Sequence, residues 1–145
     1  MNRKIRFRAW DKARQIMIGY DYHKNWDKEA DSEEYYAPSY SLWLGFIEQA
    51  CEDEGLIVEQ FTGLIDKNFN PIYENDIIKR EWSYNNTVTV KVVQWDDRRA
   101  GFTTDKERLA DYFHNHPGDL YEVIGNIHEN PELLEEIYGP PGIKY

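Results

Sequence analysis

The sequence feature that most constrains the fold is a run of short β-type segments between Leu56 and Phe102. β-Branched and aromatic residues alternate there with polar ones, most regularly at Val88, Val90 and Val92, which is typical of strands with one buried face. Asn, Asp and Pro separate the segments, and these residues favour turns. Short strands joined by tight connections favour an antiparallel sheet, here one that curls into a small, partly open barrel.

The pattern along the whole chain predicts an α+β protein that is mainly β. Strands are expected at residues 56–62, 72–73, 77–82, 87–95, 100–103 and 120–127. Two or three short helices are expected: one from Ser41, one opened by a capping box of Thr104 and Glu107, and a last one after Asn130 and Pro131. We predict a single domain with an N-terminal hairpin (1–20), an acidic surface excursion (21–40), a barrel core (56–127) and a C-terminal helix (130–138).

Charge is distributed unevenly along the 145 residues, whose formal net charge is −10. The first 14 residues hold six basic residues and one acid, whereas residues 27–59 hold ten acids and one base. An acidic surface repels phosphate backbones, so the composition argues against general nucleic-acid binding. The lone Cys51 cannot form an internal disulfide, which predicts a reducing, cytoplasmic location. No apolar run approaches the roughly 20 residues that a membrane span needs, so no membrane association is expected.

Four blocks of the sequence together resemble the YopX family, small proteins encoded mainly by temperate phages and prophages. The blocks are residues 5–11 (IRFRAWD), 61–68 (FTGLIDKN), 72–79 (IYENDIIK) and 123–134 (VIGNIHENPELL), in the order of the family. Two positions depart from the family pattern: Asn75 stands where Gly is usual, and Phe69 where a turn Gly is common. Asn accepts a left-handed conformation well, so the first change is mild.

The resemblance implies an SH3-like β-barrel core with added helical elements. It implies no established reaction, cofactor or set of catalytic residues, so none is assigned. We interpret the four blocks as architectural. Turns and bulges are expected at Gly63, Asn75, Gly125 and Asn126, and core positions at Trp10, Leu64, Ile77 and Ile124.

Three groups of residues are candidates for catalysis or metal binding. His114 and His116 could bind a metal with Asp111 or Asp119, as in a metal-dependent hydrolase, but no further ligand set has metal spacing. The neighbouring carboxylates Asp96 and Asp97 are typical of a solvated hairpin turn, and Cys51 is typical of a small apolar filler. The sequence therefore predicts no catalytic residue, no metal, no cofactor and no enzymatic activity.

The aromatic residues divide into an expected core group and an expected surface group. The core group is Trp10, Trp43, Trp82, Trp95, Phe102 and Phe113. The surface group lies in the acidic segment, where Tyr and Trp could form a protein contact. The candidate partner-binding residues of that segment are Asp31, Glu33, Glu34, Tyr35, Tyr36 and Tyr40.

The leading functional hypothesis is a phage-type accessory protein that binds another protein, one with a basic surface. Its acidic surface could also mimic nucleic acid. The alternative is a nucleic-acid-binding module that uses an exposed basic face of the first strand, with Arg3, Arg6, Arg8 and Arg14. A metal-dependent hydrolase ranks third. Exposed sheet edges would also allow a homo-oligomer to form.

Overall fold

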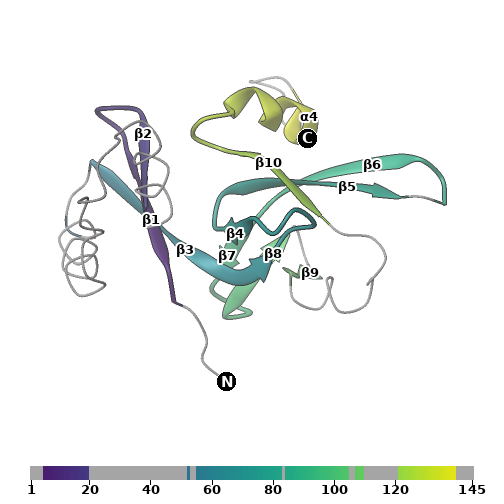
Figure 1. Ribbon diagram of the computed structural model, residues 1–145, viewed down its shortest axis with the longest axis horizontal. Helices are drawn as coiled ribbons and strands as arrows, with labels where there is room; N and C mark the ends of the chain where they lie inside the picture. Colours follow the sequence, from purple (N-terminus) through teal and green to yellow (C-terminus); the bar gives the residue numbers. More distant parts are fainter. Residues whose placement is uncertain are drawn as a thin grey trace, which may run out of the picture. The chain divides into compact units, whose positions relative to one another are not determined.

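The computed structural model describes residues 5–19, 52, 55–82, 84–104, 107–109 and 121–139. This part of the chain is mainly β, with a curled antiparallel half-barrel sheet and one short α-helix (Figure 1). The chain divides into two compact units, residues 1–61 and 62–145. Strand β3 (Leu56–Ile65) crosses the division, so its first half belongs to unit 1 and its second half to unit 2.

Unit 1 is built on the predicted N-terminal hairpin. Strands β1 (Phe7–Asp11) and β2 (Ile16–Gly19) pair antiparallel, and the other edge of β1 pairs antiparallel with β3. The carboxylate of Asp11 closes the turn, because its Oδ1 accepts hydrogen bonds from the N–H groups of Ala13 and Arg14 at 2.9 and 3.0 Å. The hairpin prediction is confirmed, and the predicted core residue Trp10 is buried.

Unit 2 contains the remaining strands. Strand β4 (Pro71–Tyr73) forms a hairpin with the second half of β3, where the hydroxyl of Thr62 donates to the carbonyl of Ile72 at 2.7 Å. Strand β5 (Asp76–Trp82) is the centre of a three-stranded sheet, between β10 (Glu122–Asn126) and β6 (Thr87–Val92). Strands β7 (Gln94–Asp96), β8 (Gly101–Thr104) and β9 (Glu107–Arg108) form another sheet.

The predicted strand over residues 87–95 is wrong in one respect, because it is interrupted at Val93. The N–H of Val93 donates to the carbonyl of Asp76, and its carbonyl accepts from the N–H of Asn75, at 2.9 and 2.7 Å. Asn75 itself has a φ of 63°. This turn between β4 and β5 fixes Val93 at the sheet end, and the chain continues from there into β7 of a different sheet.

The predicted capping box is also wrong. Thr104 is the last residue of β8 and is buried, and Glu107 belongs to β9, which pairs antiparallel with β8. The strand pairing provides the backbone contacts that a helix start would otherwise need, so the Thr-x-x-Glu spacing has no capping role here.

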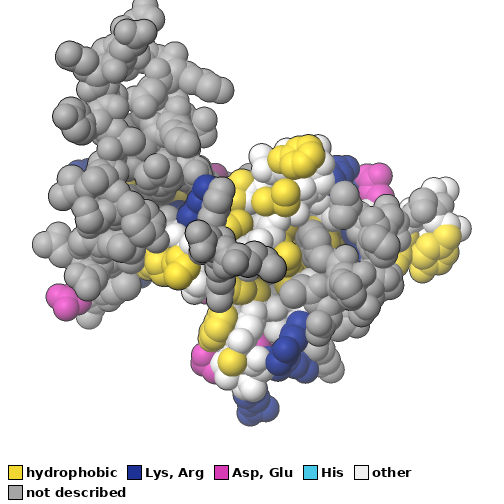
Figure 2. Space-filling model, turned by 60° about the horizontal axis from the view of Figure 1, so that its bottom comes forward, with side chains coloured by type: hydrophobic (Ala, Val, Ile, Leu, Met, Phe, Trp, Pro, Cys, Tyr) yellow, Lys and Arg dark blue, Asp and Glu magenta, His cyan; other side chains and the backbone are white. Residues whose placement is uncertain are grey.

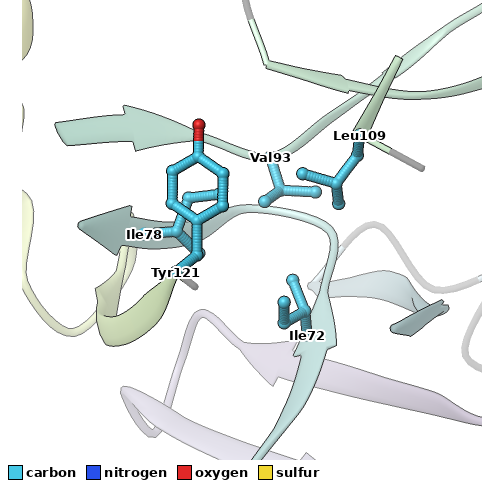
Figure 3. Packing of buried hydrophobic residues seen from close by; sticks show 5 residues of the cluster. All are labelled: Ile72, Ile78, Val93, Leu109 and Tyr121. Atoms are coloured by element: carbon cyan, nitrogen blue, oxygen red, sulfur yellow. The ribbon is translucent and has the colours of Figure 1, made fainter. Parts of the chain in front are cut away.

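The core of unit 2 is formed by side chains from five separate places in the chain. Figure 3 shows them pointing toward one another: Ile72, Ile78, Val93, Leu109 and Tyr121. Leu64, Trp82, Phe102 and Val123 pack against this cluster and are partly buried.

The predicted core positions of unit 2 have different outcomes. Ile77 is buried as predicted, and Ile124 is half-buried. The predicted core position of Trp95 is wrong, because its side chain is 45% exposed. Its ring packs edge-to-face on Phe102 at 5.1 Å, and its Nε1 donates to Asp97 at 2.9 Å. The indole thus has an apolar and a polar contact while one side remains in water.

The C-terminal helix is confirmed as a 3₁₀ turn, η1 (Pro131–Leu133), followed by α4 (Leu134–Tyr138). Asn130 precedes it but makes no side-chain cap hydrogen bond; instead its Oδ1 accepts from the N–H of Asn126 at 3.2 Å. The expected helix from Ser41 lies outside the described residues apart from Glu52, which is helical. The acidic excursion at 21–40 lies wholly outside them. None of the described helices is long and apolar enough to span a bilayer.

Candidate functional site

The large apolar side chain with the highest exposure in the described part of the chain is Phe69, at the tip of the β3–β4 hairpin, where it is 82% exposed. Its backbone has a φ of 65°, a left-handed conformation that costs a bulky L-residue on the order of 1–2 kcal/mol. Exposing a phenyl ring to water is also unfavourable. Because strain and apolar exposure coincide at Phe69, this loop is the candidate contact site.

The loop that carries Phe69 is held by the buried carboxylate of Asp66. Its Oδ1 accepts from the N–H groups of Asn68 and Asn70, both at 2.8 Å. Its Oδ2 accepts from the N–H of Val123 at 2.9 Å, which ties the loop to β10. The tip is therefore ordered before any partner binds, and a preordered contact residue loses little entropy on binding.

The charges beside Phe69 compensate one another. The ammonium of Lys67 lies 3.2 Å from a carboxylate oxygen of Glu122, and the backbone N–H of Lys67 donates to the carbonyl of Tyr121 at 3.0 Å. The loop thus presents an aromatic ring without an excess of positive charge. That combination suits an apolar pocket on a protein better than a phosphate backbone.

The predicted partner-binding residues of the acidic segment all lie outside the described residues: Asp31, Glu33, Glu34, Tyr35, Tyr36 and Tyr40. The structure therefore does not test that surface. It stays a prediction.

The predicted basic face of the first strand is wrong at Arg8. The guanidinium of Arg8 lies 2.7 Å from the carboxylate of Glu59, which is directly opposite in the β1–β3 pairing, and the two side chains are only 3% and 1% exposed. Arg6 is half-buried, with its guanidinium 5.9 Å from the centre of the Phe61 ring.

The other two residues of that face are Arg3 and Arg14. Arg14 is exposed beside Asp11, at 3.8 Å between Nε and Oδ2. Arg3 lies outside the described residues. Among the described residues, Arg6, Arg8 and Arg14 do not form the continuous exposed basic surface that the alternation predicted, because Arg8 is buried.

The candidate metal and nucleophile residues, Cys51, Asp111, His114, His116 and Asp119, also lie outside the described residues. Within the described ranges no group of three or more His, Cys, Asp or Glu side chains could hold a metal ion.

The carboxylates of Asp96 and Asp97 lie in a hairpin turn, as predicted. Oδ1 of Asp96 accepts from the N–H groups of Arg98 and Arg99 at 2.9 and 3.1 Å, and its Oδ2 pairs with the Arg99 guanidinium at 2.9 Å. The backbone N–H of Arg99 is the main cause of a lowered pKa at Asp96. Its carboxylate is thus held ionised as a turn acceptor, which is the opposite of what a general acid requires.

The residues that carry the family resemblance have architectural roles. Gly125 lies where the β10–β5 register shifts, and a Cβ atom at this position would meet Asn130 Oδ1. Oδ1 of the buried Asn126 accepts from the N–H groups of His128 and Glu129 at 3.0 and 2.9 Å. Gly63 has a φ of 88°, as a turn or bulge position requires. The expectations for these turn residues agree with the structure.

Sequence reasoning missed Phe69 as an exposed contact residue. The available signal was its position, since Asp66, Asn68, Asn70 and Pro71 mark a turn around it. An aromatic residue inside such a cluster has no strand or helix face through which to reach a core.

Comparisons with known proteins agree with the architecture. The sequence model of one family, described as YopX protein, matches residues 6–135. Among solved structures, the chain is similar to the crystal structure of protein EF1440 from Enterococcus faecalis, with 24% identity and a TM-score of 0.56 over 92% of this chain and 100% of that chain. At this identity the likeness concerns the fold alone. No curated protein matches the chain.

Proposed function

Because the chain belongs to the YopX family, we propose that it is a phage-type accessory protein without catalytic activity, which acts in the host cytoplasm by binding another protein. Within that proposal the half-barrel of unit 2 is an SH3-like scaffold. The observation that carries the proposal is the Phe69 loop, where an exposed ring lies on a strained backbone and the buried carboxylate of Asp66 holds the loop backbone.

The partner that this loop fits is a protein with an apolar pocket. Aromatic side chains that enter such pockets are frequent binding hot spots, because they bury a large area at a small entropic cost. The acidic, Tyr-bearing residues 27–40 would add a second contact, to a basic surface of the same partner. Nucleic acid is a weaker candidate, since Arg8 faces Glu59 inside unit 1.

The test compares two asparagine substitutions at exposed aromatic residues. Phe69→Asn removes the ring and relieves the backbone strain, because Asn accepts a positive φ, so this variant should fold at least as well as the wild type. Tyr84→Asn is the matched control, since Tyr84 is 77% exposed at a different hairpin tip. Each chain is used to capture proteins from host lysate, which are quantified by mass spectrometry.

We expect a protein that the wild type and Tyr84→Asn recover equally and that Phe69→Asn loses by at least about 30-fold, the size of a hot-spot effect. Replacing Asp31, Glu33 and Glu34 by their amides should weaken the same complex and reduce its salt dependence. If all variants recover the same proteins in the same amounts, neither surface is the binding site.

A further inference from the structure

Strand β6 is the outer strand of the three-stranded sheet β10-β5-β6. Its residues 87–90, Thr-Val-Thr-Val, are all β-branched and uncharged, and no described residue pairs with their outer edge. Natural sheets protect such edges with charged side chains, a proline or a bulge. None of these devices lies within residues 87–90, so this edge is suited to pair with another strand.

The backbone groups that face outward can be assigned from the hydrogen bonding of β6, which alternates between the two sides of the strand. The N–H of Val93 donates to the carbonyl of Asp76 at 2.9 Å, and the same register continues along the whole β5–β6 pairing. Every second residue from Val93 therefore directs its N–H and C=O toward β5. Val88 and Val90 direct theirs to the outer edge.

In the described part of the chain, the β5–β6 hairpin extends beyond the third strand, while α4 also contacts β6. Strand β10 pairs only with the first half of β5, whereas β6 pairs with β5 as far as Trp82. Nε1 of Trp82 donates to Oγ1 of Thr89 at 2.9 Å, and the Arg80 guanidinium lies 3.5 Å from the centre of the indole ring. Val88 is 52% exposed, and Figure 2 shows hydrophobic side chains at the projecting end.

We propose that two copies of this chain associate through antiparallel pairing of their β6 edges about a two-fold axis at Thr89. In this register Val88 lies opposite Val90 of the second copy, and the outward N–H and C=O groups of these valines form four hydrogen bonds between the copies. An axis at Val88 would instead place Val90 opposite Asn86, which has left the strand with a φ of 55°. An axis at Val90 would pair Val88 with Val92, which is only 5% exposed. The axis at Thr89 therefore pairs the two valines of β6 that are not buried.

The side chains on the valine face also complement one another. Within one copy Lys79 lies opposite Val90 and Glu81 opposite Val88, and Lys79 and Glu81 form an ion pair at 2.8 Å. In the dimer the β5 and β6 strands of both copies would form one four-stranded sheet. A line of neighbouring side chains across it would contain Lys79 and Val90 of one copy and then Val88 and Glu81 of the other. Valines meet in the middle and no like charges are opposed. A two-fold interface needs a surface that complements itself, so a second copy is the occupant that fits this edge.

The register is tested by disulfide trapping in a chain whose Cys51 is replaced by Ser. Thr89 faces its own copy in a non-hydrogen-bonded pair, where the Cα atoms are about 4.5 Å apart, within the range of a disulfide. Thr89→Cys should form a covalent dimer on mild oxidation. Thr87→Cys is the control, because its thiol would face Lys91 of the second copy and should form no covalent dimer. Equal trapping of both variants, or of neither, would overturn the proposed register.

The interface itself is tested by sedimentation equilibrium over a range of concentrations. A proline is tolerated in an edge strand where the lost N–H points outward, so Val88→Pro should fold normally by circular dichroism. It removes two of the four hydrogen bonds and should raise the dimer dissociation constant about 30-fold. Val88→Thr keeps the backbone donor and should still dimerise. A wild-type chain that remains monomeric throughout refutes the dimer, whatever Phe69 binds.

Discussion

A methyl group added at Gly125 would occupy space that Asn130 already fills. The added Cβ would overlap Oδ1 of Asn130 and would lie 2.6 Å from its Cγ and 3.0 Å from its Cβ. The backbone of Gly125 is not left-handed, so an L-residue can adopt it without strain. The cost of Gly125→Ala is therefore steric, and it falls on one identifiable side chain.

The size of the destabilisation follows from the hydrogen bond that Asn130 would lose. Its Oδ1 accepts from the N–H of the buried Asn126 at 3.2 Å. Moving the side chain leaves that N–H without its acceptor, at about 1–3 kcal/mol, and an off-rotamer position costs about 1 kcal/mol more. The lower backbone entropy of Ala in the unfolded chain offsets about 0.5 kcal/mol of this destabilisation. Gly125→Ala should therefore lower the free energy of unfolding by about 2 kcal/mol.

The steric origin can be isolated with Asn130→Gly, which removes all three contacting atoms. In the Asn130→Gly protein, the effect of Gly125→Ala on the free energy of unfolding should change sign. The substitution should then stabilise the protein by about 0.5 kcal/mol, since only the entropy effect remains. Urea denaturation of the four proteins gives the coupling free energy, expected at about 2.5 kcal/mol. If the two substitutions are additive, the contact between Gly125 and Asn130 does not determine the bulge.

Three further perturbations test other parts of the structure. Glu59→Gln removes the carboxylate that faces the buried Arg8, and urea denaturation should show a loss of about 3 kcal/mol, whereas a loss near zero would mean that the pair is solvated. Asp66→Asn replaces an acceptor oxygen by a donor; amide exchange in the β3–β4 loop should accelerate, and unchanged exchange would mean that the loop does not depend on this carboxylate. The pKa of Asp96 is lowered mainly by the backbone N–H of Arg99, from an ordinary value of 3.8, so its stabilisation is present above that pH and is lost as pH falls through the lowered pKa. Asp96→Asn should flatten the acid side of the stability profile, and an unchanged profile would contradict the turn assignment.

Much of the fold could be predicted from the sequence because local pattern and tertiary structure agree. The hairpin of β1 and β2, the strand from Leu56 and the irregularity at Gly125 all follow from side-chain alternation or turn chemistry near each position. Errors occurred where a distant contact determined the outcome. Val93 leaves its strand because the turn at Asn75 and Asp76 binds both of its backbone groups, and no local signal marks that residue.

The candidate site was harder to predict, for two physical reasons. The alternation of apolar and basic residues around Arg8 is the same whether the basic side chains contact water or a buried carboxylate. The burial of Arg8 depends on Glu59, which is 51 residues away in the sequence. Phe69 is aromatic, and aromatic residues are usually buried, so composition alone assigns it to a core. The turn residues around Phe69 are a signal against a core position, but the 82% exposure of its side chain is known only from the structure.

The positions of the family blocks also limit where recognition can occur. Asp66, Asp76 and Asn126 are buried, and each accepts at least one backbone N–H from a neighbouring segment. Using any of them to bind a ligand would break a scaffold hydrogen bond and leave a buried donor without its acceptor, at about 1–3 kcal/mol. A partner is therefore bound at lower cost by groups that the scaffold does not hold. In the described part of the chain, the ring of Phe69 and the outer edge of β6 meet that condition.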